Sequence, residues 1–150
     1  MTPTQLQEFL PAQIPLTGAM ELKVESCGRH GVHLSAPIAP NINHRQTLFG
    51  GSAAAIAIMS AWSLVHLRLR NTSDPPPRIV IQRNSMSWNT PIPGEVHAKC
   101  ESPDEDTWER LLKTLHRKGR GRIILRSTLF TDETPAAEFT GTFVAINMAG

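Results

Sequence analysis

The chain has 150 residues, and 40% of them are hydrophobic, which is enough to build one core. Lysine and arginine total 15 against 13 acidic residues, so the net charge of +2 indicates neither a nucleic-acid-binding protein nor an acidic scaffold. Cys27 and Cys100 have no C-x-x-C spacing, and they indicate neither a disulfide framework nor a zinc ribbon. We therefore expect one domain over residues 1–150, in a reducing cytoplasm.

The N-terminal third predicts one short helix and a hairpin. Thr4 and Gln7 have the spacing of a capping box, and Pro11 is expected to end the helix that they begin. Apolar and polar residues alternate over residues 20–26 and again over residues 32–36, which is the pattern of half-buried strands. Glycines lie between the two segments, so we expect the strands to form a hairpin.

The segment that follows contains no Asp, Glu, Lys or Arg from residue 46 to residue 67. This pattern predicts a helix that is buried along nearly its whole length and begins at Gly50 and Gly51. Its length is close to that of a membrane span, but many of its residues are alanine, serine or glycine, so we expect a core helix. No secretory signal peptide is recognisable before it.

The second half predicts four strands and an amphipathic helix. Strands are expected over residues 79–88 and 95–100, after a polar connector over residues 71–77. Ser102 as N-cap and Gly119 as stop delimit a helix with an apolar face, and Trp88 and Trp108 are expected in the core or at an interface. Two final strands, over residues 122–130 and 137–147, surround a turn at residues 132–135.

Six mostly antiparallel strands and one long apolar helix predict an α+β fold in which the sheet curves around the helix. This is the hotdog architecture, and four motifs resemble those of hotdog-fold thioesterases. They are Pro-Asn-Ile-Asn at 40–43, Thr-Leu-Phe-Gly-Gly-Ser at 47–52, the strand at 79–85, and Pro-Ile-Pro-Gly at 91–94. The chain looks most like the thioesterase group that also occurs fused behind GNAT-type acetyltransferase domains, and the similarity spans about residues 20–147.

The resemblance implies an acyl thioester substrate on coenzyme A or on acyl carrier protein, with no further cofactor. It also implies a homodimer or homotetramer with its site between subunits. In such enzymes the Gly-Gly helix start and an Asn or His side chain polarise the thioester carbonyl. Carried onto this chain, those catalytic roles fall to Gly50, Gly51, Asn43 and His44, with Phe49 and Ser52 as substrate-binding neighbours. The alternative is that the glycines only permit close packing of helix on sheet.

The chain departs from the pattern at the catalytic acid. Many hotdog thioesterases carry Asp or Glu about two turns into the helix, and residues 56–60 contain neither. Related sequences have an acid in the third strand, where this chain has Asn84 and Ser85, which we keep as catalytic candidates. An amide can position water but cannot accept its proton. The base is then His44 or a carboxylate of a partner subunit. The alternative function is a non-catalytic module that binds acyl thioesters or serves an assembly. A hydratase is the least favoured of the functions considered.

Two further clusters allow functional interpretations. Seven basic residues and no acid lie between residues 110 and 126, of which Arg117, Lys118, Arg120 and Arg122 are the candidates for binding coenzyme A phosphates or an acidic carrier protein. The alternative is a solvated helix end. Cys27, His30 and His33 supply too few ligands for a metal site. We expect neither metal, nucleic acid nor membrane as a partner.

Overall fold

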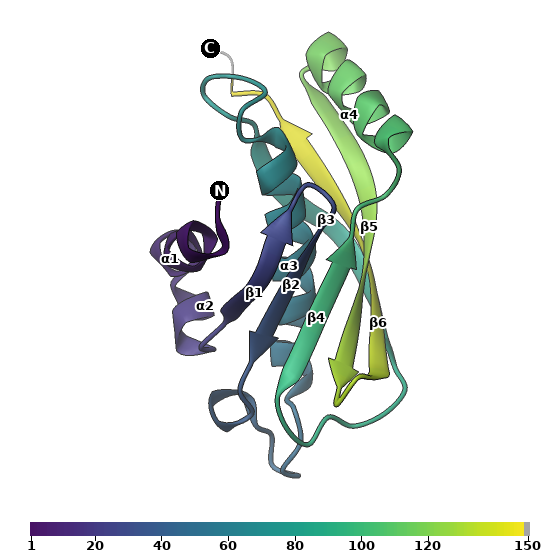
Figure 1. The fold of residues 1–150 in the computed structure, drawn as a ribbon. Helices are drawn as coiled ribbons and strands as arrows, with labels where there is room; N and C mark the ends of the chain where they lie inside the picture. Colours follow the sequence, from purple (N-terminus) through teal and green to yellow (C-terminus); the bar gives the residue numbers. More distant parts are fainter. Residues whose placement is uncertain (149–150) are drawn as a thin grey trace.

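A computed structural model describes residues 1–148. Its elements are α1 (Pro3–Gln13), α2 (Pro15–Ala19), β1 (Lys23–Gly28), β2 (Gly31–Ala36), the 3₁₀ turn η1 (Ala39–Asn41), α3 (Gly50–Leu69), β3 (Arg78–Trp88), β4 (Val96–Glu101), α4 (Glu105–Lys118), β5 (Arg120–Thr131) and β6 (Thr134–Ile146). The strands form one antiparallel sheet in the order β1-β2-β4-β5-β6-β3. The predicted arrangement is confirmed, because this sheet curves around α3 (Figure 1).

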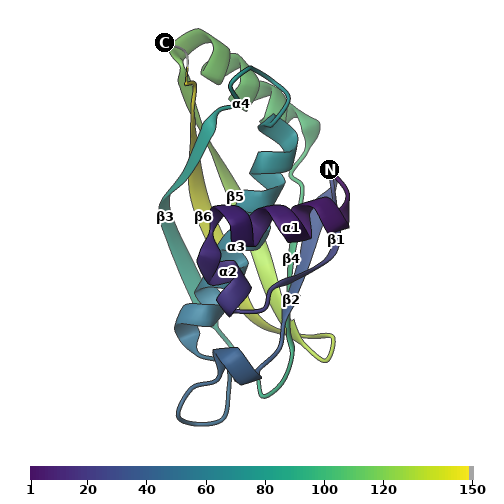
Figure 2. The ribbon, with the colours of Figure 1, turned by 90° about the vertical axis from the view of Figure 1, so that its left-hand side faces the viewer.

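The helix α3 is less completely buried than its sequence predicts. Ten of its 20 residues are buried, while Ala54, Ala55, Ile58 and Trp62 are only half-buried. By length and composition α3 could also span a membrane, a test that core helices of soluble proteins pass as well. One side of α3 faces the sheet, and α1 crosses the other side (Figure 2). The rest of that side remains open in the single chain.

The start of α1 differs from the prediction. Thr2, rather than Thr4, is the N-cap, and its hydroxyl accepts the Gln5 N–H while the Gln5 side chain accepts the Thr2 N–H. Thr2 has the extended backbone that a cap requires, with ψ 164°. Pro11 lies inside α1 and does not end it.

The start of α4 is also displaced from its prediction, by two residues. Asp104 is the N-cap, and its carboxylate accepts the Thr107 N–H at 2.9 Å. Ser102, the predicted cap, instead accepts a hydrogen bond from the Trp108 indole at 2.7 Å. The predicted stop is confirmed, since Gly119 has a left-handed backbone with φ 75°.

Two strand boundaries follow from left-handed residues. Glu21 has φ 57°, so β1 begins at Lys23 and not at residue 20. The turn before β6 has only two residues, Asp132 and Glu133, with φ 47° and 65°. Positive φ at both positions is typical of a tight hairpin turn, and β6 therefore begins at Thr134.

The two edge strands of the sheet, β1 and β3, differ in what lies against their backbone. Along β1, the Gln7 side chain of α1 donates to the Leu22 carbonyl and accepts the Val24 N–H, both at 2.6 Å. This amide occupies the place of a neighbouring strand. At the other edge, β3 pairs with no described strand except β6, and the Trp62 indole of α3 donates to the Ile79 carbonyl at 3.2 Å. An edge strand of 11 residues with no second strand beside it is a ready site for pairing with another chain.

Candidate functional site

The start of α3 carries three unpaired backbone donors. Phe49 is the N-cap, and its side chain makes no capping hydrogen bond. Ala53 is the first residue of α3 whose N–H has an acceptor, the Phe49 carbonyl at 3.0 Å. The N–H groups of Gly50, Gly51 and Ser52 have no partner among residues 1–148. Such a helix start attracts negative charge, because the free donors and the helix dipole point the same way.

The loop before α3 holds these donors in place. Its backbone is tied by hydrogen bonds from Leu48 N–H to the Ile92 carbonyl and from Phe49 N–H to the Asn41 carbonyl, each at 2.8 Å. Asn41 is only 2% exposed, and its side-chain amide donates to the carbonyls of Met20 and Pro37. The loop is therefore fixed to three separate parts of the chain.

An apolar cavity of about 300 Å³ opens beside the helix start. Its walls come from α3, from the end of β3, from the β3–β4 loop and from β6, and its residues include Leu48, Ala53, Trp88, Ile92 and Ala137. Trp88 reaches the helix start, since its ring lies 3.7 Å from the position that a Cβ on Gly50 would occupy. An apolar group bound in this cavity would lie next to backbone donors.

Asn43 and His44 lie in the loop near the helix start, but Asn43 has no free donor. Its amide nitrogen donates to Thr47 Oγ1 at 2.9 Å and to the Leu48 carbonyl at 3.3 Å, and its oxygen accepts from the Arg45 and Thr47 N–H groups. This side chain therefore shapes the loop. His44 is exposed at the tip.

Asn84 and Ser85 point to opposite sides of β3. Asn84 lies across from Gly141, on the face of the sheet that contacts α3, whereas Ser85 lies across from Thr140 on the outer face. Only Asn84 can therefore face the helix. It lies four residues before Trp88, which corresponds to about 13 Å along the strand.

The four predicted basic residues lie at the other end of the molecule. Arg117 and Lys118 belong to the last turn of α4, and Arg120 and Arg122 begin β5. This end lies beside the C-terminus of α3, where Arg68 stacks on the Trp108 ring at 4.6 Å (Figure 1). Since a 20-residue helix is about 30 Å long, these side chains do not join the Gly51 site within one chain.

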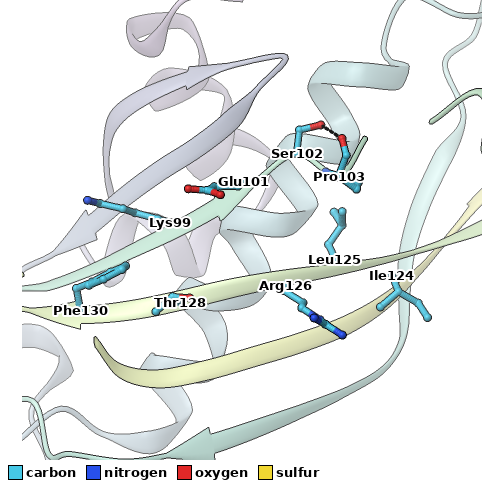
Figure 3. Close-up of a pocket in the computed structure, with 9 residues that line it drawn as sticks. All are labelled: Lys99, Glu101, Ser102, Pro103, Ile124, Leu125, Arg126, Thr128 and Phe130. Carbon is cyan, nitrogen blue, oxygen red and sulfur yellow. Dashed lines mark hydrogen bonds between the residues drawn. The ribbon is translucent and has the colours of Figure 1, made fainter. Parts of the chain in front are cut away.

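A second cavity, about 680 Å³, lies elsewhere, where β4 and β5 separate (Figure 3). β4 pairs with β5 only from His97 to Lys99. Next to this paired stretch, the Ser127 hydroxyl of β5 lies 2.7 Å from the Ser60 hydroxyl of α3. Lys99, Glu101 and Arg126 line this cavity. It shares no lining residue with the cavity beside the helix start.

Other reactive groups are also distant from the helix start. Burial raises the pKa of the Cys100 thiol to about 12, which keeps it protonated. His97 lies 2.7 Å from Glu95 and 2.8 Å from His33 on the outer face of the sheet. Among residues 1–148, no group of three His, Cys, Asp or Glu side chains could hold a metal.

Sequence reasoning missed three residues that build the site. Asn41, Trp88 and Ile92 hold the loop or form the cavity wall, and Trp88 and Ile92 lie 38 and 42 residues after Gly50. Pro-Asn-Ile-Asn at residues 40–43 was a usable signal, but it drew attention to Asn43 while Asn41 is the buried side chain.

Comparison with known proteins identifies close relatives in fold. The family model described as "Putative thioesterase (yiiD_Cterm)" matches residues 3–147. A protein of unknown function from Chlorobaculum tepidum is 30% identical, with a TM-score of 0.89 over 97% of each chain. A putative thioesterase from Shewanella oneidensis is 26% identical, with a TM-score of 0.83 over 96% of each chain. A thioesterase from Haemophilus influenzae, 13% identical, shows the same fold, with a TM-score of 0.78 over 100% of this chain and 94% of its own. The α+β hotdog fold is thereby confirmed.

Proposed function

Because the chain belongs to the family described as "Putative thioesterase (yiiD_Cterm)", we propose that it hydrolyses an acyl thioester carried on coenzyme A or on acyl carrier protein. Coenzyme A would enter only as part of the substrate or product. The resemblance to the group that also occurs fused behind GNAT-type acetyltransferases, and a cytoplasmic location, belong to the same proposal.

One observation carries the proposal: three N–H groups without a partner begin a 20-residue helix, and Leu48 and Ala53 on either side of them line an apolar cavity. The acyl group would occupy the cavity, and its carbonyl oxygen would accept from Gly50, Gly51 or Ser52. Water adds to the carbonyl carbon, the donors stabilise the oxyanion, and the thiolate leaves as the tetrahedral intermediate collapses. Asn43 would position the donors through its loop.

The water must also lose a proton. Among the described residues, α3 carries no carboxylate, and the polar side chain of β3 on the face toward α3 is Asn84. Because Asn84 lies about 13 Å along β3 from Trp88 in its own chain, we propose that it orients the water at the site of a second subunit. The base also comes from a second subunit, with His44 as the alternative. The edge of β3 that pairs with no second strand and the half-buried face of α3 support a homodimer, because a partner subunit would complete the burial of both. A homotetramer is equally compatible with this pairing.

Matched glycine variants test the donors. Gly50→Pro and Gly51→Pro each remove one N–H in the first helical turn, where proline is tolerated. Gly50→Ala has ordinary space beside Trp88, and Gly51→Ala meets only the exposed ring of Phe49, so these are the steric controls. Thiol release from a panel of acyl-CoA substrates should fall about 10²-fold or more in at least one proline variant and little in its alanine control. Equal rates in each pair would contradict carbonyl polarisation at this helix.

Two outcomes would change the proposal more broadly. If no acyl-CoA or acyl carrier protein is hydrolysed but acyl thioesters raise the melting temperature, the chain is a binding module, as the lack of a carboxylate on α3 allows. The homodimer is tested by sedimentation of Ser85→Lys, which places like charges across the middle of a β3–β3 pair. Ser26→Lys on β1 is the control, and dimers that persist in both variants would exclude the β3 interface.

A further inference from the structure

Five arginines from two separate parts of the sequence lie on one face of the sheet. The register of β5, β6 and β3 aligns Arg120 and Arg78 on either side of Ile146, and Arg122 and Val80 on either side of Val144. The next two rows are Ile124–Thr142–Arg83 and Arg126–Thr140–Ser85. All these side chains lie on the outer face, since the intervening residues of β5 and β6 face the core. Figure 3 shows Ile124 and Arg126 on the opposite side of β5 from Leu125.

This arginine face (Arg78, Arg83, Arg120, Arg122, Arg126) has almost no acidic counterpart. All five residues are exposed, and none forms an ion pair with another residue between 1 and 148. The one acid on the outer face of these three strands is Glu138, which lies in the row beyond Arg126 and accepts from Thr128 at 2.9 Å. Clustered guanidinium groups repel one another, so this face favours an acidic ligand.

The arginines form two rows with an uncharged strip between them. The rows lie on β5 and β3, two strand spacings or about 10 Å apart, and extend over about 20 Å along the strands. The strip along β6 consists of Ile146, Val144, Thr142 and Thr140, of which Val144 is buried. The exposed apolar area lies beside it, on Val80 and Ile124, which are 42% and 58% exposed. An α-helix is about 10–12 Å wide, so it would lie along β6 with both flanks against arginines.

We propose that the arginine face binds an acidic amphipathic helix of a partner protein. The strip takes the apolar stripe of the helix, and the guanidinium forks on both sides pair with carboxylates. Single-stranded nucleic acid fits less well, because the aromatic side chain of β5 on the outer face, Phe130, lies four residues beyond Arg126 and is already covered by the Lys99 ammonium at 5.0 Å. A second copy of the same face is unfavourable, since five arginines would meet five. The inference does not depend on the proposed hydrolysis, and pairing along the β3 edge leaves the face accessible.

A designed peptide provides the probe. It is an amphipathic helix with an apolar stripe flanked by glutamates, and its scrambled sequence has the same charge without the stripe. Binding is measured by fluorescence anisotropy against the intact protein, against Arg83→Ser/Arg122→Ser, and against Arg110→Ser/Lys113→Ser on α4 as the charge-matched control. Circular dichroism establishes that both variants are folded.

The proposal expects the designed peptide to bind the intact protein and the α4 control alike, and the arginine-face variant about tenfold or more weakly. The scrambled peptide should bind more weakly than the designed one. Equal affinity of the two peptides, or equal affinity of the two variants, would overturn the proposal. So would a DNA duplex or free coenzyme A that binds more tightly than the peptide and loses affinity in the same arginine-face variant.

Discussion

The Gln7 side chain protects the β1 edge, and removing its amide should measurably destabilise the fold. Gln7→Met keeps the length and helix preference of the side chain but removes both hydrogen bonds to β1. Each partly buried bond contributes about 1 kcal/mol net, so the free energy of unfolding should fall by about 2 kcal/mol. For a chain of this size that corresponds to a melting temperature lower by about 4–8 °C.

The assay is urea unfolding of Gln7→Met, followed by circular dichroism, with Gln13→Met as the control. Gln13 is exposed at the end of α1, and its side chain makes no hydrogen bond within residues 1–148. We also expect Gln7→Met to aggregate more readily, because the Leu22 carbonyl and Val24 N–H become free at an edge. If Gln7→Met and Gln13→Met have the same free energy of unfolding, the Gln7 hydrogen bonds do not stabilise the fold. That result would refute the conclusion that the Gln7 amide protects the β1 edge.

Two other properties can be measured on the same protein. Gly31→Ala should lower the free energy of unfolding in urea by about 1–3 kcal/mol, because its Cβ would lie 2.9 Å from the Cys100 carbonyl. Gly28→Ala is the control and should be nearly neutral, since a Cβ there meets nothing within 4 Å. Equal losses in the two variants would contradict the close approach of β2 and β4. Burial lowers the pKa values of His33 and His66 in the folded chain, with smaller contributions from His97 and Lys99 at His33 and from Arg70 at His66. The unfolded chain then binds protons more readily, so stability should be full above about pH 6.5 and fall as the pH drops through the lower folded values. His66→Phe keeps the stacking on Phe9 and Trp62 and should reduce this loss, and a urea midpoint independent of pH would refute the assignment.

Much of the fold could be predicted because its patterns are local. Alternation marked β2 and β4, and Gly119 ended α4 as expected. Helix starts were less secure, because Thr2 and Thr4, or Ser102 and Asp104, fit similar capping patterns. Only the backbone conformation around each residue selects between them.

The candidate site likewise has features that the sequence predicts and features that it does not. Gly50 and Gly51 could be found from the sequence, because two glycines before an uncharged helix predict free N–H groups. The sequence does not show that the Asn43 amide is used up by hydrogen bonds within its own loop, because those bonds depend on how the loop closes. Nor does it show that Ser85 points to the outer face, because that depends on the strand register. A shift of one residue in register would have exchanged Asn84 and Ser85 between the two faces.

The sequence by itself determined the α+β class, the central helix and its glycine start, because hydrophobic periodicity and glycine conformation are properties of short segments. The tertiary structure decided which residues meet. It brought Trp88 and Ile92 to the helix start, moved Arg117 and Lys118 to the opposite end, and aligned arginines 40 residues apart across β6. Those contacts depend on sheet order and register, which are set by packing between segments that are distant in the chain.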